Sequence, residues 1–234
     1  MAKSKYGQIF QLIRRLFMTF LVSEMTHVSN PIKTGIFYTR KELLMINENQ
    51  STENALILRR FFIATALFIF FLTLVLPSAS KKNSTIFGEA KLPDTSLFYS
   101  GQEIYQTAEA IGTEGRSFYV RQRISYDFIW PLVYAWFLYA SLRLIYRRSS
   151  HEILINSIRW LPIIGLGFDY AENAFAIIIM LFYPTRLLFA ERWLPIMSII
   201  KWSSIATAFI LIVTGIVIWT IRTARGREAS RWEK

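Results

Sequence analysis

The stretch FFIATALFIFFLTLVLPSAS, residues 61–80, decides the fold class. It contains no charged residue and follows the pair Arg59-Arg60. A helix rises about 1.5 Å per residue, so about 20 apolar residues cross a hydrocarbon core of about 30 Å. The small residues at its end resemble a signal-peptidase site, but 60 residues precede the run, too many for an ordinary signal peptide. The stretch therefore predicts a first transmembrane helix.

Three further apolar runs lie at residues 128–146, 160–182 and 195–221. Arg147-Arg148 follows the first of them and Arg222 follows the last. All are continuous rather than alternating, which is typical of helices and not of barrel strands. The sequence predicts an all-α membrane protein, a four-transmembrane-helix bundle that occupies residues 57–221.

The long connection at residues 81–127 has its own helix signals. Ser100 and Glu103 fit a capping box, and Gly112 fits a helix C-terminus. A second helix should follow and merge with the second span. We expect a small helical cap on the outer side of the membrane.

Composition excludes several classes of function. The chain is 53% hydrophobic and 18% charged, against about 25% charged residues in soluble domains. The net charge of +11 does not indicate nucleic-acid binding, because long apolar runs separate the charges. The chain has no cysteine, and both histidines lie in polar segments. We therefore expect no disulfide, no thiol chemistry, no metal and no cofactor.

Charge asymmetry predicts the orientation. Residues 1–60, 143–159 and 222–234 together carry 18 basic and 7 acidic side chains, whereas 81–127 and 183–194 carry 8 and 7. The positive-inside rule places both termini in the cytoplasm. A bacterial cytoplasmic membrane is expected, with a eukaryotic organelle membrane as the alternative.

Within the N-terminal segment 1–56, helical spacing of apolar residues over 6–21 predicts a helix at the membrane interface or against a partner protein. Residues 222–234 form a basic tail.

The third span carries an unusual polar face. Asp169, Glu172 and Asn173 stand at i, i+3 and i+4, so they share one side of a helix. Asp169 is about 13–14 Å along the span, near the membrane midplane. A charge there costs roughly 2.5–3.5 kcal/mol, so it needs partners or a function. Lys201 on the fourth span lies at a depth from which it can reach Glu172.

The second span adds Asp127 at its outer mouth and Tyr134 two turns on, with Arg116 shortly before. Together these residues predict a polar seam that runs from the outer loop to mid-membrane. Either the seam binds, transforms or relays something, or it is an ion-paired network that only fixes helix register. Gly165 and Gly167 favour close helix approach or a local break.

The combination of these residues resembles a group of bacterial four-span membrane proteins that has no established activity. The resemblance covers residues 55–221 and implies fold and placement only. Its residues are Pro93, Asp94, Gly112, Gly115, Arg116, Tyr119, Asp127, Pro131, Tyr134, Asp169, Glu172, Asn173, Lys201 and Trp202.

Three functions remain open on the sequence. The favoured one is a non-enzymatic accessory or ligand- or lipid-binding protein, whose partners are the bilayer and either another membrane protein or a second copy. The second is a lipid-active enzyme that uses Asp169 or Glu172 as acid or base. The third is a small oligomeric transporter, which lacks the internal inverted repeat common in that class. None of the sequence motifs G-x-S-x-G, H-E-x-x-H or the Walker loop is present.

Overall fold

The computed structural model describes residues 40–87, 99–147 and 157–232. The interface helix expected at 6–21 lies outside these residues, as do both histidines, Pro93 and Asp94. The chain divides into two units, Met1–Arg60 and Phe61–Lys234. In the first unit, the described residues form the start of helix α2, Arg40–Phe70.

Helices are the regular secondary structure of the described part of the second unit, which contains no strand. Four helical stretches are long and apolar enough to cross a membrane, which confirms the predicted fold class. They are Ser51–Ser84, Gly112–Tyr146, Ser157–Phe182 and Leu188–Arg225. The elements after α2 are η1 (Phe71–Val75), α3 (Leu76–Phe87), α4 (Gly101–Ala110), α5 (Gly112–Tyr146), α7 (Leu161–Phe182) and α8 (Leu188–Trp232).

The first span changes pitch at its middle. The turn η1 is π-helical and ends two residues before Pro77, whose ring clashes with the i−4 carbonyl in a regular α-helix. Aromatic stacking attaches this span to α5: the Phe68 ring lies 4.3 Å from Phe137 and 5.5 Å from Trp130, centroid to centroid. Only 11% of its most apolar window is buried within the chain, so most of its surface is left for the bilayer.

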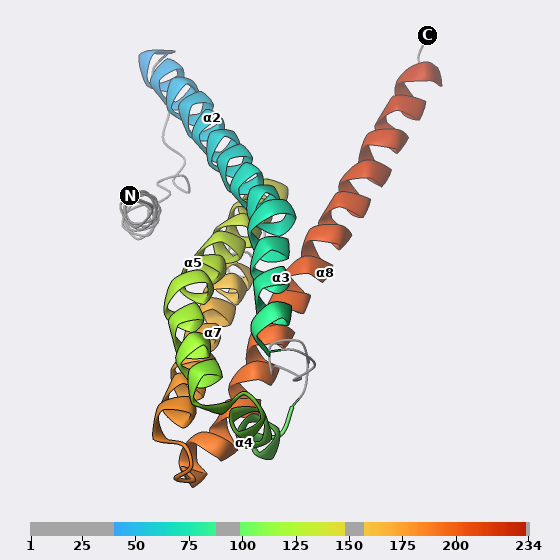
Figure 1. Cartoon of the computed structure of the whole chain (residues 1–234). Coiled ribbons are helices and arrows are strands. Elements are labelled where there is room, and N and C mark those ends of the chain that lie inside the picture. Colours follow the sequence, from blue (N-terminus) through green and yellow to red (C-terminus); the bar gives the residue numbers. More distant parts are fainter. Residues whose placement is uncertain (1–39, 88–98, 148–156, 233–234) are drawn as a thin grey trace, which may run out of the picture. The chain divides into compact units, whose positions relative to one another are not determined.

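Helices α5, α7 and α8 pack together as the core of the bundle (Figure 1). Gly165 permits the approach of α7 to α8, since a Cβ there would lie 3.3 Å from Ile205 and 3.8 Å from the Lys201 carbonyl. A Cβ at Gly167 would meet nothing within 4 Å. Helix α7 is unbroken at both glycines, so Gly165 serves close packing and neither marks a break.

The cap helix α4 begins at the predicted capping box. The Glu103 amide donates to Ser100 Oγ (3.3 Å), and the Ser100 amide donates to Glu103 Oε2 (2.7 Å). Gly112 then joins α4 to α5 with φ +63°, a left-handed conformation that glycine adopts at little cost.

Helix α4 lies at the end of the bundle where α7 turns into α8 (Figure 1). The Leu187 amide of that turn donates to the Tyr105 hydroxyl at 2.7 Å. A buried apolar cluster joins the three helices: Ile104, Tyr105 and Ala108 of α4, Ala176, Ile179 and Met180 of α7, and Ala190 and Leu194 of α8.

Two helices extend beyond the predicted spans. Helix α5 starts at Gly112 and merges with the second span, as expected. Helix α8 includes Pro195 in its interior and continues past Arg222 to Trp232. Arg222 ends the apolar run but not the helix, because intrahelical hydrogen bonds do not depend on apolar side chains.

Candidate functional site

The predicted carboxylate face of α7 is buried inside the bundle. Asp169, Glu172 and Asn173 are 7%, 1% and 5% exposed, respectively. Because the three residues lie within about one helical turn of each other, all three face α5 and α8, where each has a hydrogen-bond or ion-pair partner. The helix therefore presents two acids and an amide to its neighbours rather than to lipid.

Lys201 of α8 supplies the main counter-charge. Its ammonium contacts Glu172 Oε2 and lies 3.9 Å from Asp169 Oδ1. The lysine is 8% exposed, so the pair is enclosed. The reach across helices expected from the sequence is therefore realised, and one ammonium is shared between two carboxylates.

Tyr99, just before the cap helix, completes the Glu172 environment. Its hydroxyl donates to Glu172 Oε1 at 2.7 Å. Burial, and next the Glu172 charge, raise the pKa of Tyr99 well above its usual value, so the phenol stays protonated and donates. Glu172 thus joins the cap, α7 and α8. The sequence contains no signal for this contact, because the two residues are 73 positions apart.

Asp169 is held by hydrogen bonds from α5 and from its own helix. The Tyr134 hydroxyl donates to Oδ2 at 2.9 Å, and the Asn173 amide donates to Oδ1 at 3.3 Å. Tyr134 was expected in the seam, and the structure brings it there. Both oxygens of this mid-span carboxylate therefore have a donor within the protein.

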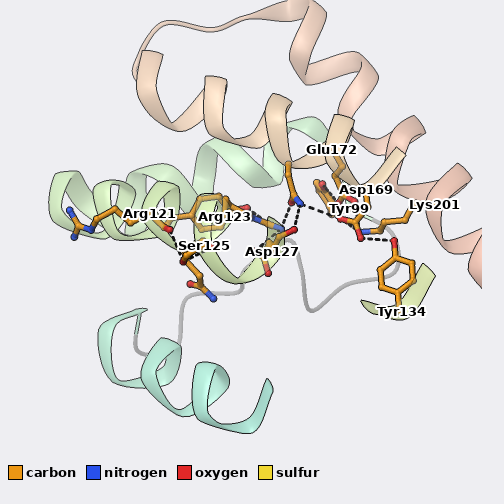
Figure 2. A network of polar contacts seen from close by, with 12 residues as sticks. Tyr99, Arg121, Arg123, Ser125, Asp127, Tyr134, Asp169, Glu172 and Lys201 are labelled. Carbon is orange, nitrogen blue, oxygen red and sulfur yellow. Dashed lines mark hydrogen bonds and ion pairs between the residues drawn. The ribbon is translucent and has the colours of Figure 1, made fainter. Parts of the chain in front are cut away.

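Arg123 of α5 extends the network toward Asp127. Its guanidinium donates to Asn173 Oδ1 (2.5 Å) and to the Tyr119 hydroxyl (2.6 Å), and it lies 3.3 Å from Asp127 Oδ2. The Asn173 amide also donates to the Asp127 carbonyl at 3.3 Å. Figure 2 shows one connected line of polar side chains from Asp127 to Lys201.

The sequence places Arg121 and Arg123, with Arg116, just before the second span, but Arg123 and Tyr119 were not among the candidates for the seam, although a signal was available. Tyr119, Arg123 and Asp127 follow one another at i+4 spacing, which places them on one face of a helix. An arginine on the face that carries an intramembrane acid is its most accessible partner. The i+4 spacing therefore predicts that both residues belong to the polar seam.

Arg116 lies apart from the network. It donates to the Ala108 carbonyl at 2.8 Å and to Thr113 Oγ1 at 3.0 Å, and its guanidinium stacks on the Tyr183 ring at 4.5 Å. The residue satisfies the C-terminus of α4 and fastens it to the α7–α8 turn. Its contacts are those of a cap-stabilising residue.

The charges of the network do not balance. Two cations, Arg123 and Lys201, face the three carboxyl groups of Asp127, Asp169 and Glu172. An uncompensated charge in low-dielectric surroundings is unfavourable. Chemically, the site can accept one positive charge. Among the described residues, no group of His, Cys, Asp and Glu side chains is arranged to hold a metal ion.

Comparison of the chain with protein-family models, with curated proteins and with solved structures finds no match. The resemblance to bacterial four-span proteins therefore stays a prediction from its motif residues.

Proposed function

We propose that this chain is a non-enzymatic membrane protein, an accessory or binding subunit, that binds a positively charged group at its intramembrane polar network. One observation carries the proposal: the network, which is buried except at the partly exposed Asp127, holds one more carboxylate than cation. A purely structural network gains nothing from an excess charge, because ion pairs inside a protein are favourable only when both partners are satisfied.

The contacts favour binding over acid–base catalysis. A general acid or base must reach the substrate with one of its oxygens. The Glu172 oxygens contact Tyr99 and Lys201, and the Asp169 oxygens accept from Tyr134 and Asn173. A lipid-active enzyme would have to open both sets of contacts before its carboxylates met a substrate.

The proposed placement is the cytoplasmic membrane, with both termini inside and the cap outside. Two observations support it. The basic excess of the sequence lies in the segments assigned to the inner side. The cap helix also contacts the α7–α8 turn through Tyr105 and Leu187, so both segments assigned to the outer side lie at one end of the bundle.

Thermal unfolding of the full chain in detergent tests the proposal. The probes are choline chloride, ethanolamine hydrochloride, a native lipid extract and a step to lower pH. The two salts are compared with sodium chloride, and all samples are kept at equal ionic strength. At least one probe should raise the Tm of the wild type, because a ligand that binds only the folded state stabilises it. Asp169→Asn removes the excess charge and should abolish that response.

The matched control is Glu109→Gln, which neutralises an exposed carboxylate on the cap helix. This variant should respond like the wild type. If none of the four probes raises the Tm of the wild type, the network binds no positive group and the proposed function is wrong.

A further inference from the structure

We infer that the positive charge accepted by the network is a proton, taken up reversibly by the Asp169 carboxylate. The inference rests on the proposed function and names its ligand. It is carried by the positions of the cations, the enclosure of Asp169 and the chemistry of its two hydrogen-bond partners.

The cation positions single out Asp169. Glu172 contacts the Lys201 ammonium, and Asp127 lies 3.3 Å from the Arg123 guanidinium. Asp169 is 3.9 Å from the same ammonium that Glu172 contacts. Each of the two cations therefore pairs more closely with another acid than with Asp169. Since one carboxylate exceeds the number of cations, Asp169 is the acid left with a hydrogen-bonded but poorly compensated charge.

Enclosure favours a proton over a larger cation. Asp169 is 7% exposed, and each of its oxygens already accepts a hydrogen bond. An organic cation would have to displace Tyr134 or Asn173 to reach it. A proton binds directly to an oxygen and needs no added volume.

The partners allow uptake without rearrangement of heavy atoms. A hydronium ion supplies the proton: one of its O–H bonds breaks, which releases water, and an O–H bond forms at Asp169 Oδ2. Because a phenol both donates and accepts, the hydrogen bond then reverses: Asp169 donates to the Tyr134 oxygen. The Asn173 amide continues to donate to Oδ1. The network is left with two carboxylates and two cations.

Charged groups on three helices set the balance at Asp169. Lys201 and Arg123 oppose proton uptake, whereas the negative charges of Glu172 and Asp127 favour it. The titratable and charged groups around the site are Arg123, Asp127 and Tyr134 on α5, Tyr170 and Glu172 on α7, Lys201 on α8, and Tyr99, which reaches the site through Glu172.

Infrared spectroscopy of the full chain in lipid vesicles tests the inference through the carbonyl stretch of a protonated carboxyl. Exposed carboxyls have a pKa of about 4, so well above that pH they are ionised and give no such band. The wild type should show a protonated-carboxyl band in this range that grows as the pH falls. The band should be absent from Asp169→Asn and retained in the control Glu109→Gln, which neutralises an exposed carboxylate outside the network. In Tyr134→Phe it should be shifted, because the carboxyl loses its hydrogen-bond partner.

Each other result overturns the inference. A band that persists in Asp169→Asn would assign the proton to another acid, and a band that disappears in Glu109→Gln would assign it to a carboxyl outside the network. If Asp169→Asn does not fold, Tyr134→Phe decides, since an unshifted band would show that the carboxyl is not Asp169. If choline or ethanolamine raises the Tm while no band forms at any pH, the proposed function stands and only the proton is wrong.

Discussion

Arg121 and Arg123 stand two positions apart on α5 but in opposite environments. Arg121 is exposed and points away from the network in Figure 2. Arg123 is 6% exposed and joins Tyr119, Asn173 and Asp127. Successive residues on a helix are rotated around its axis, so neighbouring arginines differ this strongly.

This contrast gives a matched pair of variants. Arg123→Met keeps the length of the side chain but leaves Asp127 without its ion-pair partner, which should lower the free energy of unfolding by about 3–5 kcal/mol. Arg121→Met should change it by no more than about 0.5 kcal/mol. Equilibrium unfolding in detergent measures both. Equal effects of the two variants would contradict the structural assignment of Arg123.

The shared ammonium of Lys201 makes a second residue-level prediction. Lys201→Met leaves Glu172 and Asp169 facing each other without a cation. Glu172→Gln in the same chain removes one of those charges, so the double variant should be less destabilised than the sum of the two single variants, by a coupling energy of about 0.5–3 kcal/mol. A double-mutant cycle by thermal unfolding measures this. Additive effects would show that the two residues are not coupled.

At the scale of elements, the docking of α4 on α8 depends on one glycine. A Cβ at Gly101 would lie 2.1 Å from the Glu191 carbonyl oxygen, which is backbone and cannot turn aside. Gly101→Ala should therefore lower the Tm clearly. Gly167→Ala, where a Cβ meets nothing within 4 Å, should leave stability unchanged or raise it by about 0.5–1 kcal/mol. A tolerated Gly101→Ala would mean that the cap and α8 do not approach this closely.

Tyr99 is the link between the cap and the network. Tyr99→Phe keeps the ring in the apolar cluster and removes only the hydroxyl that donates to Glu172. Hydrogen exchange followed by mass spectrometry should show faster exchange in α4, with α7 and α8 unchanged, because local stability follows local contacts. Phe118→Leu, a conservative change at a partly buried ring on the cluster's margin, is the control and should leave α4 exchange closer to that of the wild type. No change in Tyr99→Phe would mean that the hydroxyl does not hold the cap.

At the scale of the whole molecule, the absence of cysteine allows a direct test of orientation. Gln106→Cys places a thiol on the exposed face of the cap, and Arg225→Cys places one near the end of α8. With a membrane-impermeant maleimide added to intact cells, Gln106→Cys should be labelled and Arg225→Cys should not. Permeabilised cells should label both. The reverse pattern would place the basic segments outside.

Much of the architecture was predictable from local sequence. The four apolar runs gave the four membrane helices, and Ser100 with Glu103 gave the start of α4. The polar face of α7 was predictable because helical periodicity fixes which residues lie together. Comparing depths along two helices put Lys201 within reach of Glu172, and the structure shows that the two side chains are in contact.

The role of Arg116 and the place of Tyr99 were not predictable in the same way. Proximity in sequence to Asp127 suggested the seam for Arg116, but the fold of the cap brings the Ala108 carbonyl and the Tyr183 ring to it first. Tyr99 carries no pattern of its own, and only the position of α4 over α7 aims its hydroxyl at Glu172.

The sequence by itself determined that this chain is helical, that four of its segments suit a membrane, and that one of them carries acids on a single face. These properties depend on hydrophobicity and on the helical repeat, which are local. The tertiary structure decided which acid each cation serves and which acid is left over. Those assignments depend on how three helices and a cap converge within a few ångströms. The Lys201 ammonium contacts Glu172 but lies 3.9 Å from Asp169, and at this range such a difference determines which charge is compensated.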